Sequence, residues 1–167
     1  MTSYGSKVSS DMHIRNITDI NNLIEADQRI LGLDPGAKTI GLAISDIRRI
    51  VATPYNNLSR EKFSLTSKRL QEIVTEENVG ALIIGLPLNM NGSFGPAAQS
   101  NKDFADNLAQ ENFAIISLWD ERLSTVAVEK SMIQADLSRK KRSRIVDKLA
   151  ATFILQGALD LMANERN

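Results

Sequence analysis

The first half of the chain carries short strand-like runs of hydrophobic residues separated by turn-forming residues. Two of these runs are Arg29 to Leu33 and Thr39 to Ser45, and the sequence DPGAK between them contains a proline and a glycine that favour a tight turn. We therefore expect a β-hairpin. A third run, Val51 to Tyr55, can extend this hairpin by one more strand.

After the hairpin, the spacing of the apolar residues alternates between helical and continuous. Helical spacing over Glu61 to Asn78, and again over about Ala97 to Leu108, predicts two helices. Uninterrupted apolar runs over Ala81 to Leu86 and Phe113 to Trp119 are typical of strands that are buried on both faces.

The last third of the chain predicts two further helices. The first covers Thr125 to Gln134, and the second runs from about Ile145 to Met162 after a basic segment, SRKKRSR. A hairpin followed by alternating helices and strands predicts an α/β fold with a mixed five-stranded sheet that is flanked by helices.

The chain is long enough for one domain and too short for two ordinary enzyme domains, at 167 residues and 43% hydrophobic content. We expect that single domain over residues 28–167. Residues 1–27 are polar apart from a short apolar patch over Ile17 to Ile24. They predict a partly disordered N-terminal extension with room for one helical turn.

The amino-acid composition limits the kinds of catalytic and metal-binding site that the chain can form. The chain has no cysteine and one histidine, His13, so thiolate zinc sites and a Ser-His-Asp triad are disfavoured and catalysis would rest on carboxylates. Lys+Arg 20 balances Asp+Glu 20, so a polyanion must be held by a local basic cluster. No run approaches the roughly 20 apolar residues that span a bilayer, which favours a cytoplasmic protein without a membrane partner.

Acidic residues follow two of the predicted strands. Asp34 ends the first strand, at the edge where α/β sheets commonly hold active sites, although it can equally serve as a turn-forming residue. Asp120 and Glu121 directly follow the strand that ends at Trp119, and they would be costly to bury without partners. The alternative is a solvated strand end in which Arg122 neutralises one of the two acids.

A third acidic position, Asp147, begins the last predicted helix, where Ala150 and Ala151 permit close packing on the sheet. The alternative is an acid placed to favour the helix dipole. Strand ends and a helix start can bring such acids together around a divalent cation. Carboxylates suit Mg²⁺ or Mn²⁺, and two such ions can position a water and stabilise the leaving oxygen in phosphodiester hydrolysis.

The densest positive segment of the chain lies immediately before Asp147. It consists of Arg139, Lys140, Lys141, Arg142 and Arg144. Such a cluster can hold the phosphate backbone of a nucleic acid beside a metal site, and the alternative is a solvated linker. Positive charge at a helix start opposes the helix dipole, which weakens a purely structural explanation.

A loop rich in asparagine and glycine, NMNGSFG, follows the strand that ends at Leu86. Its backbone N–H groups, including those of Asn89 and Gly92, are candidates to contact a phosphate or another part of a substrate. The loop lacks the Lys-Ser/Thr ending of a P-loop, which excludes a Walker-type nucleotide site.

Four segments together resemble the YqgF family, whose members are described as Holliday junction resolvases or pre-16S rRNA nucleases. The matching segments are LGLDPGAKTIGLAISD, IIGLPLNMNGS, LWDERLST and VDKLAATFILQ. The resemblance implies an RNase H-like fold and a metal-dependent nuclease. It also implies catalytic and metal-binding roles for Asp34, Glu121 and Asp147, with Asp120 as a possible further ligand. Pro35 and the N-terminal extension depart from the family's usual pattern.

Several functional alternatives stay open at this point. The resemblance favours 5′-end processing of precursor 16S rRNA in ribosome biogenesis, with Holliday junction resolution in DNA recombination and repair, or a non-catalytic nucleic-acid-binding factor, as alternatives. Junction resolution requires a homodimer for two symmetric cuts, whereas a monomer favours RNA processing. An actin-like kinase, suggested by GLDPGAKTIGLAISD, would need a second such domain to enclose ATP.

Overall fold

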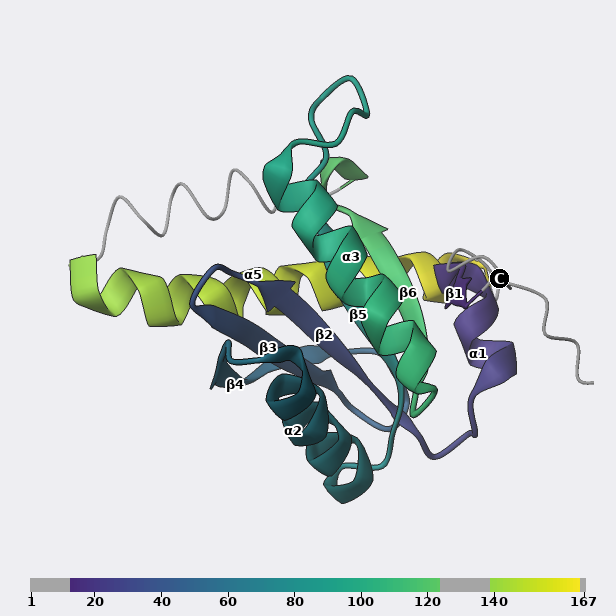
Figure 1. Ribbon diagram of the computed structural model, residues 1–167. Coiled ribbons are helices and arrows are strands. Elements are labelled where there is room, and N and C mark those ends of the chain that lie inside the picture. Colours follow the sequence, from purple (N-terminus) through teal and green to yellow (C-terminus); the bar gives the residue numbers. More distant parts are fainter. Residues whose placement is uncertain (1–12, 124–138, 166–167) are drawn as a thin grey trace, which may run out of the picture.

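The computed structural model describes residues 13–123 and 139–165, and the side chains of residues 139–147 lie outside this description. A central mixed sheet carries α5 (Arg139–Asn164) on one face and α2 (Phe63–Glu76) and α3 (Pro96–Glu111) on the other (Figure 1). The helix predicted over Thr125 to Gln134 lies outside the described residues. No helix among the described residues is long and apolar enough to cross a membrane.

The sheet has six strands in the order β1-β6-β5-β2-β3-β4. The strands are β1 (Ile14–Arg15), β2 (Arg29–Pro35), β3 (Thr39–Ser45), β4 (Ala52–Ser59), β5 (Val79–Leu86) and β6 (Ile115–Asp120). The predicted hairpin and its extension are the antiparallel strands β2, β3 and β4, whereas β2, β5 and β6 are mutually parallel. The C-terminal ends of these three parallel strands therefore meet at one edge of the sheet.

The expected strand count of five is one short, because β1 lies in the N-terminal extension. It is only two residues long and pairs in parallel with β6, so it leaves no periodic signal in the sequence. A 3₁₀ turn, η2 (Ile17–Asp19), and the short helix α1 (Ile20–Leu23) follow it. Because Ile17 and Ile20 are buried in the core, the described part of the extension packs with the rest of the fold.

The last helix begins earlier than the sequence predicted. Residues from Arg139 onward are helical, so the basic segment forms the first turns of α5 and does not lead into it. Arginine and lysine are good helix formers, and no glycine or proline interrupts the segment. Asp147 therefore lies in the third turn of α5, beyond the first turn in which a helix dipole favours an acid.

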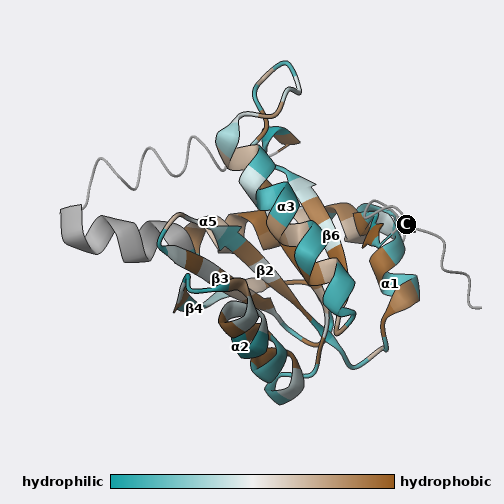
Figure 2. Ribbon diagram, viewed as in Figure 1, coloured by the Kyte–Doolittle hydropathy of each residue, from teal (hydrophilic) through white to brown (hydrophobic). Residues whose placement is uncertain are grey.

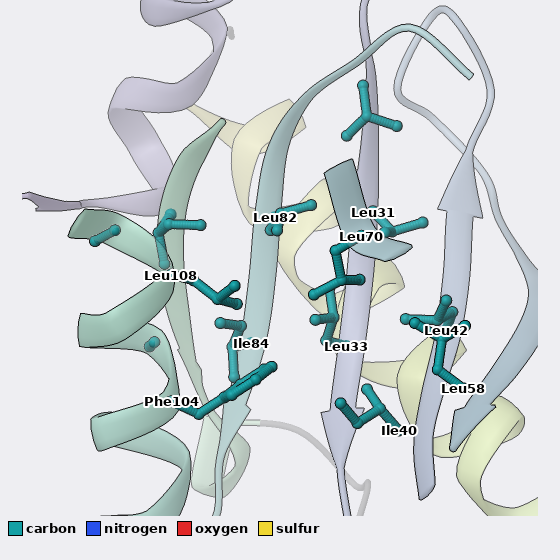
Figure 3. Packing of buried hydrophobic residues seen from close by; sticks show 14 of the residues in the cluster. Leu31, Leu33, Ile40, Leu42, Leu58, Leu70, Leu82, Ile84, Phe104 and Leu108 are labelled. Carbon is teal, nitrogen blue, oxygen red and sulfur yellow. The ribbon is translucent and has the colours of Figure 1, made fainter. Parts of the chain in front are cut away.

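Two hydrophobic layers hold the helices against the sheet, and Figure 2 shows hydrophobic residues concentrated on the strands. On the α2/α3 face, Leu70 and Phe104 pack with side chains of β2 and β5, including Leu33 and Ile84 (Figure 3). On the opposite face, α5 approaches closely because Gly32 has no side chain. A Cβ at Gly32 would lie 2.9 Å from the carbonyl oxygen of Ala151.

Candidate active site

Asp34 lies at the C-terminal end of β2 and is only 8% exposed. Its neighbours Leu31 and Leu33 belong to the hydrophobic layer under α2 and α3. Because side chains alternate along a strand, Asp34 shares the opposite face with Gly32, the face that α5 covers. The carboxylate therefore lies at the edge of the sheet, on the side that faces α5. The sequence predicted the edge but not the face.

Glu121 begins the 3₁₀ turn η3 (Glu121–Leu123), directly after β6, and is 9% exposed. Its Oε1 atom lies above Gly85 of β5, at 3.0 Å from where the Cβ of an alanine would be. The position after a strand gave no reason to choose between Glu121 and Asp120, and only the family resemblance favoured Glu121. Gly85 supplies that reason, because the missing side chain leaves space for the Glu121 carboxylate.

The strand register brings Asp34 and Glu121 to the same place. Leu33 of β2 pairs with Ile84 of β5, so the next residue, Asp34, lies beside Gly85. On the other side of β5, Gly85 pairs with Trp119 of β6, and Glu121 comes two residues after Trp119. Both acids lie on the α5 side of the sheet, since Trp119 belongs to the hydrophobic layer under α5. Two buried carboxylates thus lie at one edge of the sheet, on the strands to either side of Gly85.

Asp120 has a different environment. The Arg122 guanidinium forms an ion pair with it at 2.7 Å, and Asp120 Oδ1 also accepts a hydrogen bond from the Arg122 backbone N–H at 3.0 Å. The side-chain hydrogen bond from Arg122 lowers the pKa of Asp120, against a smaller opposing effect of burial. The ion pair with Arg122, one of the two alternatives in the sequence, is therefore present. A metal-binding role for Asp120 stays a prediction.

Arg122 also ties η3 to the loop after β5. Its Nη1 donates to the backbone oxygen of Met90 at 3.3 Å, and the guanidinium lies over Gly92, whose φ of 85° suits a glycine. The N–H of Gly92 donates to Asn89 at 2.8 Å, and the N–H of Asn89 donates to Ser93 at 3.0 Å. These two N–H groups, which the sequence suggested as substrate contacts, are used to build the loop.

Asp147 and the five basic residues lie on α5, but their side chains fall outside the described part of the chain. Residue 147 precedes Ala151 by four positions and Ile154 by seven, and both of these side chains are buried in the layer under α5. Among the described residues, no group of three histidine, cysteine or acidic side chains is placed to hold a metal ion. A complete metal site would therefore need a residue beyond Asp34 and Glu121.

Gly85 is the site residue that sequence reasoning missed. The run ALIIGL was interpreted as a uniform buried strand, and its glycine was given no role. An isolated glycine inside a strand often marks a close approach of another group, so a signal was present. A Cβ at this position would also lie 2.5 Å from Ile154 Cδ1, which makes Gly85 a contact point for both Glu121 and α5.

Comparisons with known proteins identify the family of the chain. A family model described as RuvX, Holliday junction resolvase, matches residues 28–161. A protein of Gluconacetobacter diazotrophicus named "Putative pre-16S rRNA nuclease" is 48% identical over 153 residues, which cover 91% of this chain and 99% of the relative. A protein of Rhodobacter capsulatus with the same name is 53% identical over 135 residues, covering 81% of this chain and 85% of the relative.

Solved structures confirm the fold. Thermus thermophilus RuvC in complex with a Holliday junction substrate matches with a TM-score of 0.51 and 13% identity, covering 81% of this chain and 96% of RuvC. The yeast mitochondrial Holliday junction resolvase matches with a TM-score of 0.51 and 12% identity, covering 90% and 85%. The expected RNase H-like fold is therefore confirmed. With the family model matching most of its length, the chain belongs to the RuvX family.

Proposed function

We propose that this chain is a divalent-metal-dependent nuclease that hydrolyses phosphodiester bonds at the edge of the sheet where Asp34 and Glu121 lie. Membership of the RuvX family supports nucleic-acid hydrolysis. The observation that carries the metal-dependent mechanism is the placement of two buried carboxylates on either side of Gly85. A divalent cation bound at this edge would attract both negative charges.

The residues at this edge fit a hard divalent cation. Asp34 and Glu121 offer carboxylate oxygens, which Mg²⁺ and Mn²⁺ prefer, and Gly85 leaves the space that a side chain would otherwise fill. We assign Asp147 as the third ligand, because its position in α5 repeats at helical spacing with Ala151 and Ile154, which pack on this face of the sheet. Asp120 would have to give up its ion pair with Arg122 to bind a metal, so we propose at most an auxiliary role for it.

A bound Mg²⁺ or Mn²⁺ supplies charge neutralisation of the scissile phosphate and activation of an attacking water. The chain contributes the geometry. Asp34 is held by the hairpin strand β2, and Glu121 is held at the end of β6 against Gly85, so both carboxylates are fixed by buried elements before substrate binds. Groups that are positioned in advance need no rearrangement as charge develops on the phosphate.

The basic residues at the start of α5 are proposed to hold the phosphate backbone of the substrate. The group consists of Arg139, Lys140, Lys141, Arg142 and Arg144. It begins the same helix that carries Asp147, so backbone binding and metal binding would be coupled through α5. Replacing two of these residues by alanine should weaken substrate binding and reduce its dependence on salt concentration, because each phosphate contact releases condensed counterions.

We propose 5′-end processing of precursor 16S rRNA as the cellular reaction, because the curated relatives carry the name of that activity. The description of the family model supports the alternative, Holliday junction resolution. Phosphate contacts carry no sequence information, and the same metal chemistry serves RNA and DNA. A monomer would favour the RNA reaction and a homodimer the junction reaction, and the cytoplasm stays the predicted location.

The test compares cleavage of a precursor 16S rRNA 5′-end fragment with cleavage of a four-way DNA junction, each with Mg²⁺, with Mn²⁺ and with EDTA. We expect metal-dependent cleavage of the RNA by the wild-type protein and by Glu72→Gln, a control on the exposed surface of α2. Asp34→Asn should abolish it. Cleavage in EDTA, or full activity of Asp34→Asn, would refute the metal mechanism, and preferred cleavage of the junction would replace the proposed substrate.

A non-catalytic role is tested in cells. If the protein acts only by binding, an Asp34→Asn, Glu121→Gln double variant should restore growth and ribosomal RNA maturation in a strain that lacks the gene. We expect no restoration, although the variant should accumulate to the same level as the wild-type protein.

A further inference from the structure

A groove of about 510 Å³ opens between the first turn of α2 and the part of α3 from Pro96 to Asn107, on the sheet face opposite to α5. Both helices lie side by side on this face (Figure 1). Each begins at the edge of the sheet where β5 and β2 end, because α2 leads into β5 and α3 follows it. The groove therefore opens at the same edge as Asp34 and Glu121, but on the other face.

Arg60 connects the groove to the site. It lines the groove, and its Nη1 donates to the backbone oxygen of Gly36 at 2.9 Å. Its backbone N–H donates to Lys38 at 2.8 Å. Gly36 and Lys38 belong to the turn that directly follows Asp34 and Pro35. A molecule that contacts Arg60 is therefore bound next to the turn that follows Asp34, the candidate metal ligand.

The deeper wall of the groove offers flat surfaces. The Arg60 guanidinium lies 5.3 Å from the centre of the Phe104 ring, and the rings of Phe63 and Phe104 meet edge to face at 6.1 Å. Phe104 is buried, whereas Phe63 and Arg60 remain partly exposed. Aromatic rings and arginine planes are the surfaces on which proteins stack unpaired bases.

The rim of the groove offers hydrogen-bonding groups. Neutral amides and a hydroxyl come from Gln99, Ser100 and Asn107, and carboxylates come from Glu61 and Asp103. The amide of Gln99 donates to Asp103 at 2.9 Å, which orders that side of the rim. Two carboxylates beside one arginine disfavour a phosphate. They suit a neutral, planar group with N–H donors, which is the chemistry of a nucleobase.

We propose that this groove binds one unpaired nucleobase of the strand that flanks the cleaved bond. The inference rests on the proposed nuclease function, since it takes the strand to cross the sheet edge at Asp34. A base can enter the groove only when it has left a duplex, because its faces and edges are occupied in a base pair. The groove thus selects substrates with a single-stranded stretch next to the cleavage site over fully paired ones.

The proposal is tested by binding without cleavage. Fluorescence anisotropy in EDTA would measure the affinity of the full chain for a labelled single-stranded RNA and for a duplex of the same sequence. Asn107→Leu removes a hydrogen-bonding amide from the rim at an exposed position, and Gln110→Leu removes an amide outside the groove on the same helix. We expect Asn107→Leu to weaken single-strand binding about tenfold, from the loss of one base contact, while duplex binding stays within about twofold.

A second measurement locates the base. RNA strands that carry 2-aminopurine at successive positions should show one position whose fluorescence changes strongly on binding to the wild-type protein. That change should disappear with Asn107→Leu and persist with Gln110→Leu. Asn107→Leu must keep the thermal unfolding temperature of the wild-type protein for the comparison to hold, and Ser100→Leu provides an independent substitution at the same groove.

The outcomes separate this inference from the proposed function. Equal single-strand affinity of the wild-type, Asn107→Leu and Ser100→Leu proteins would overturn the groove proposal, even if Asp34→Asn abolishes cleavage. An equal loss of single-strand and duplex affinity would also overturn it, because the groove would then not select unpaired bases. A selective loss of single-strand affinity supports it, even for a protein in which no cleavage is detected.

Discussion

The two ends of the central sheet both bury charged side chains, but they do so in opposite ways. At one end, Arg49 in the turn between β3 and β4 is 9% exposed and donates to Asn21 Oδ1, to the backbone oxygen of Glu25 and to that of Gln28, at 2.8 to 3.1 Å. At the other end, Asp34 and Glu121 are equally buried but carry the same charge.

The difference separates a buried charge that serves stability from buried charges that serve a reaction. Arg49 is surrounded by acceptors and joins α1 to the hairpin, so its burial is compensated within the fold. Asp34 and Glu121 instead bring two like charges to one edge of the sheet, and acids gathered in this way are typical of a functional site.

Removing one charge at the carboxylate end should abolish activity without harming the fold. We expect Asp34→Asn or Glu121→Gln to lower the rate of cleavage by about 10³-fold, the scale of losing a central electrostatic group. The free energy of unfolding in metal-free buffer should stay the same or rise, because a like-charge repulsion is removed. Single-turnover cleavage and urea unfolding measure the two effects. A large loss of stability would show that these acids are structural.

Removing the charge at the other end should have the reverse effect. Arg49→Ala leaves three oxygens without their donor, so we expect the free energy of unfolding to fall by roughly 2–4 kcal/mol. The rate of cleavage per folded molecule should not change. The neighbouring Arg48→Ala, at an exposed position, is the matched control, and its free energy of unfolding should differ from that of the wild-type protein by no more than about 0.5 kcal/mol. An activity loss in a fully folded Arg49→Ala protein would contradict the contrast.

The two glycines of β5 compare the same ends within one strand. A Cβ at Gly85 would lie 2.5 Å from Ile154 Cδ1 and 3.0 Å from Glu121 Oε1, and a Cβ at Gly80 would lie 2.6 Å from Gln28 Oε1. We expect either alanine variant to cost roughly 1–3 kcal/mol through overpacking. Cleavage at a temperature where both variants are folded should be reduced only in Gly85→Ala. Equal activities would mean that the position of Glu121 is not important.

The smallest expected effect is a dependence on pH at the Arg49 end. Partial burial raises the pKa of Asp46. The hydrogen bonds that its carboxylate accepts from backbone N–H groups, including those of Val51 and Ile50, together outweigh this effect, so the pKa lies below its ordinary value. A lowered pKa stabilises the fold above about pH 4, and this contribution is lost as the pH falls through the folded-state value. Asp46→Asn should therefore cost at most about 1 kcal/mol at pH 7.

That cost should shrink toward zero as the pH falls from 7 through the folded-state pKa of Asp46, as measured by urea unfolding of both proteins across this range. Glu72→Gln, on the exposed surface of α2, should show no such trend. A difference between Asp46→Asn and the wild-type protein that does not change with pH would show that the Asp46 charge plays no part in its hydrogen bonds.

The elements that the sequence predicted correctly are those with local signals. The two strand-like runs on either side of the turn DPGAK predicted β2 and β3. Helical spacing of apolar residues predicted α2 and α3 to within a few residues. The two errors have local causes as well. A two-residue strand such as β1 has no period, and the basic residues before Ile145 lack apolar positions although they are good helix formers.

The candidate site was predicted in part. Asp34, Asp120 and Glu121 could be placed at strand ends, because a polar residue that ends an apolar run marks a strand end. The strand position could not distinguish Glu121 from Asp120, and only the family resemblance did, since the physical difference lies in the sheet face that each one occupies and in the ion pair with Arg122. It also gave no role to Arg60, whose contacts to Gly36 and Phe104 join segments far apart in the chain.

The pattern of residues along the chain was sufficient to predict the order of the elements from β2 to β6, the acids at the strand ends and the family. The position of β5 between β2 and β6, which places Gly85 between Asp34 and Glu121, is visible only in the folded protein. Pairing between distant strands depends on how both faces of the sheet are covered, and no periodicity within one strand records its neighbour. The meeting of the two carboxylates, and their contrast with Arg49, is therefore a property of the folded chain.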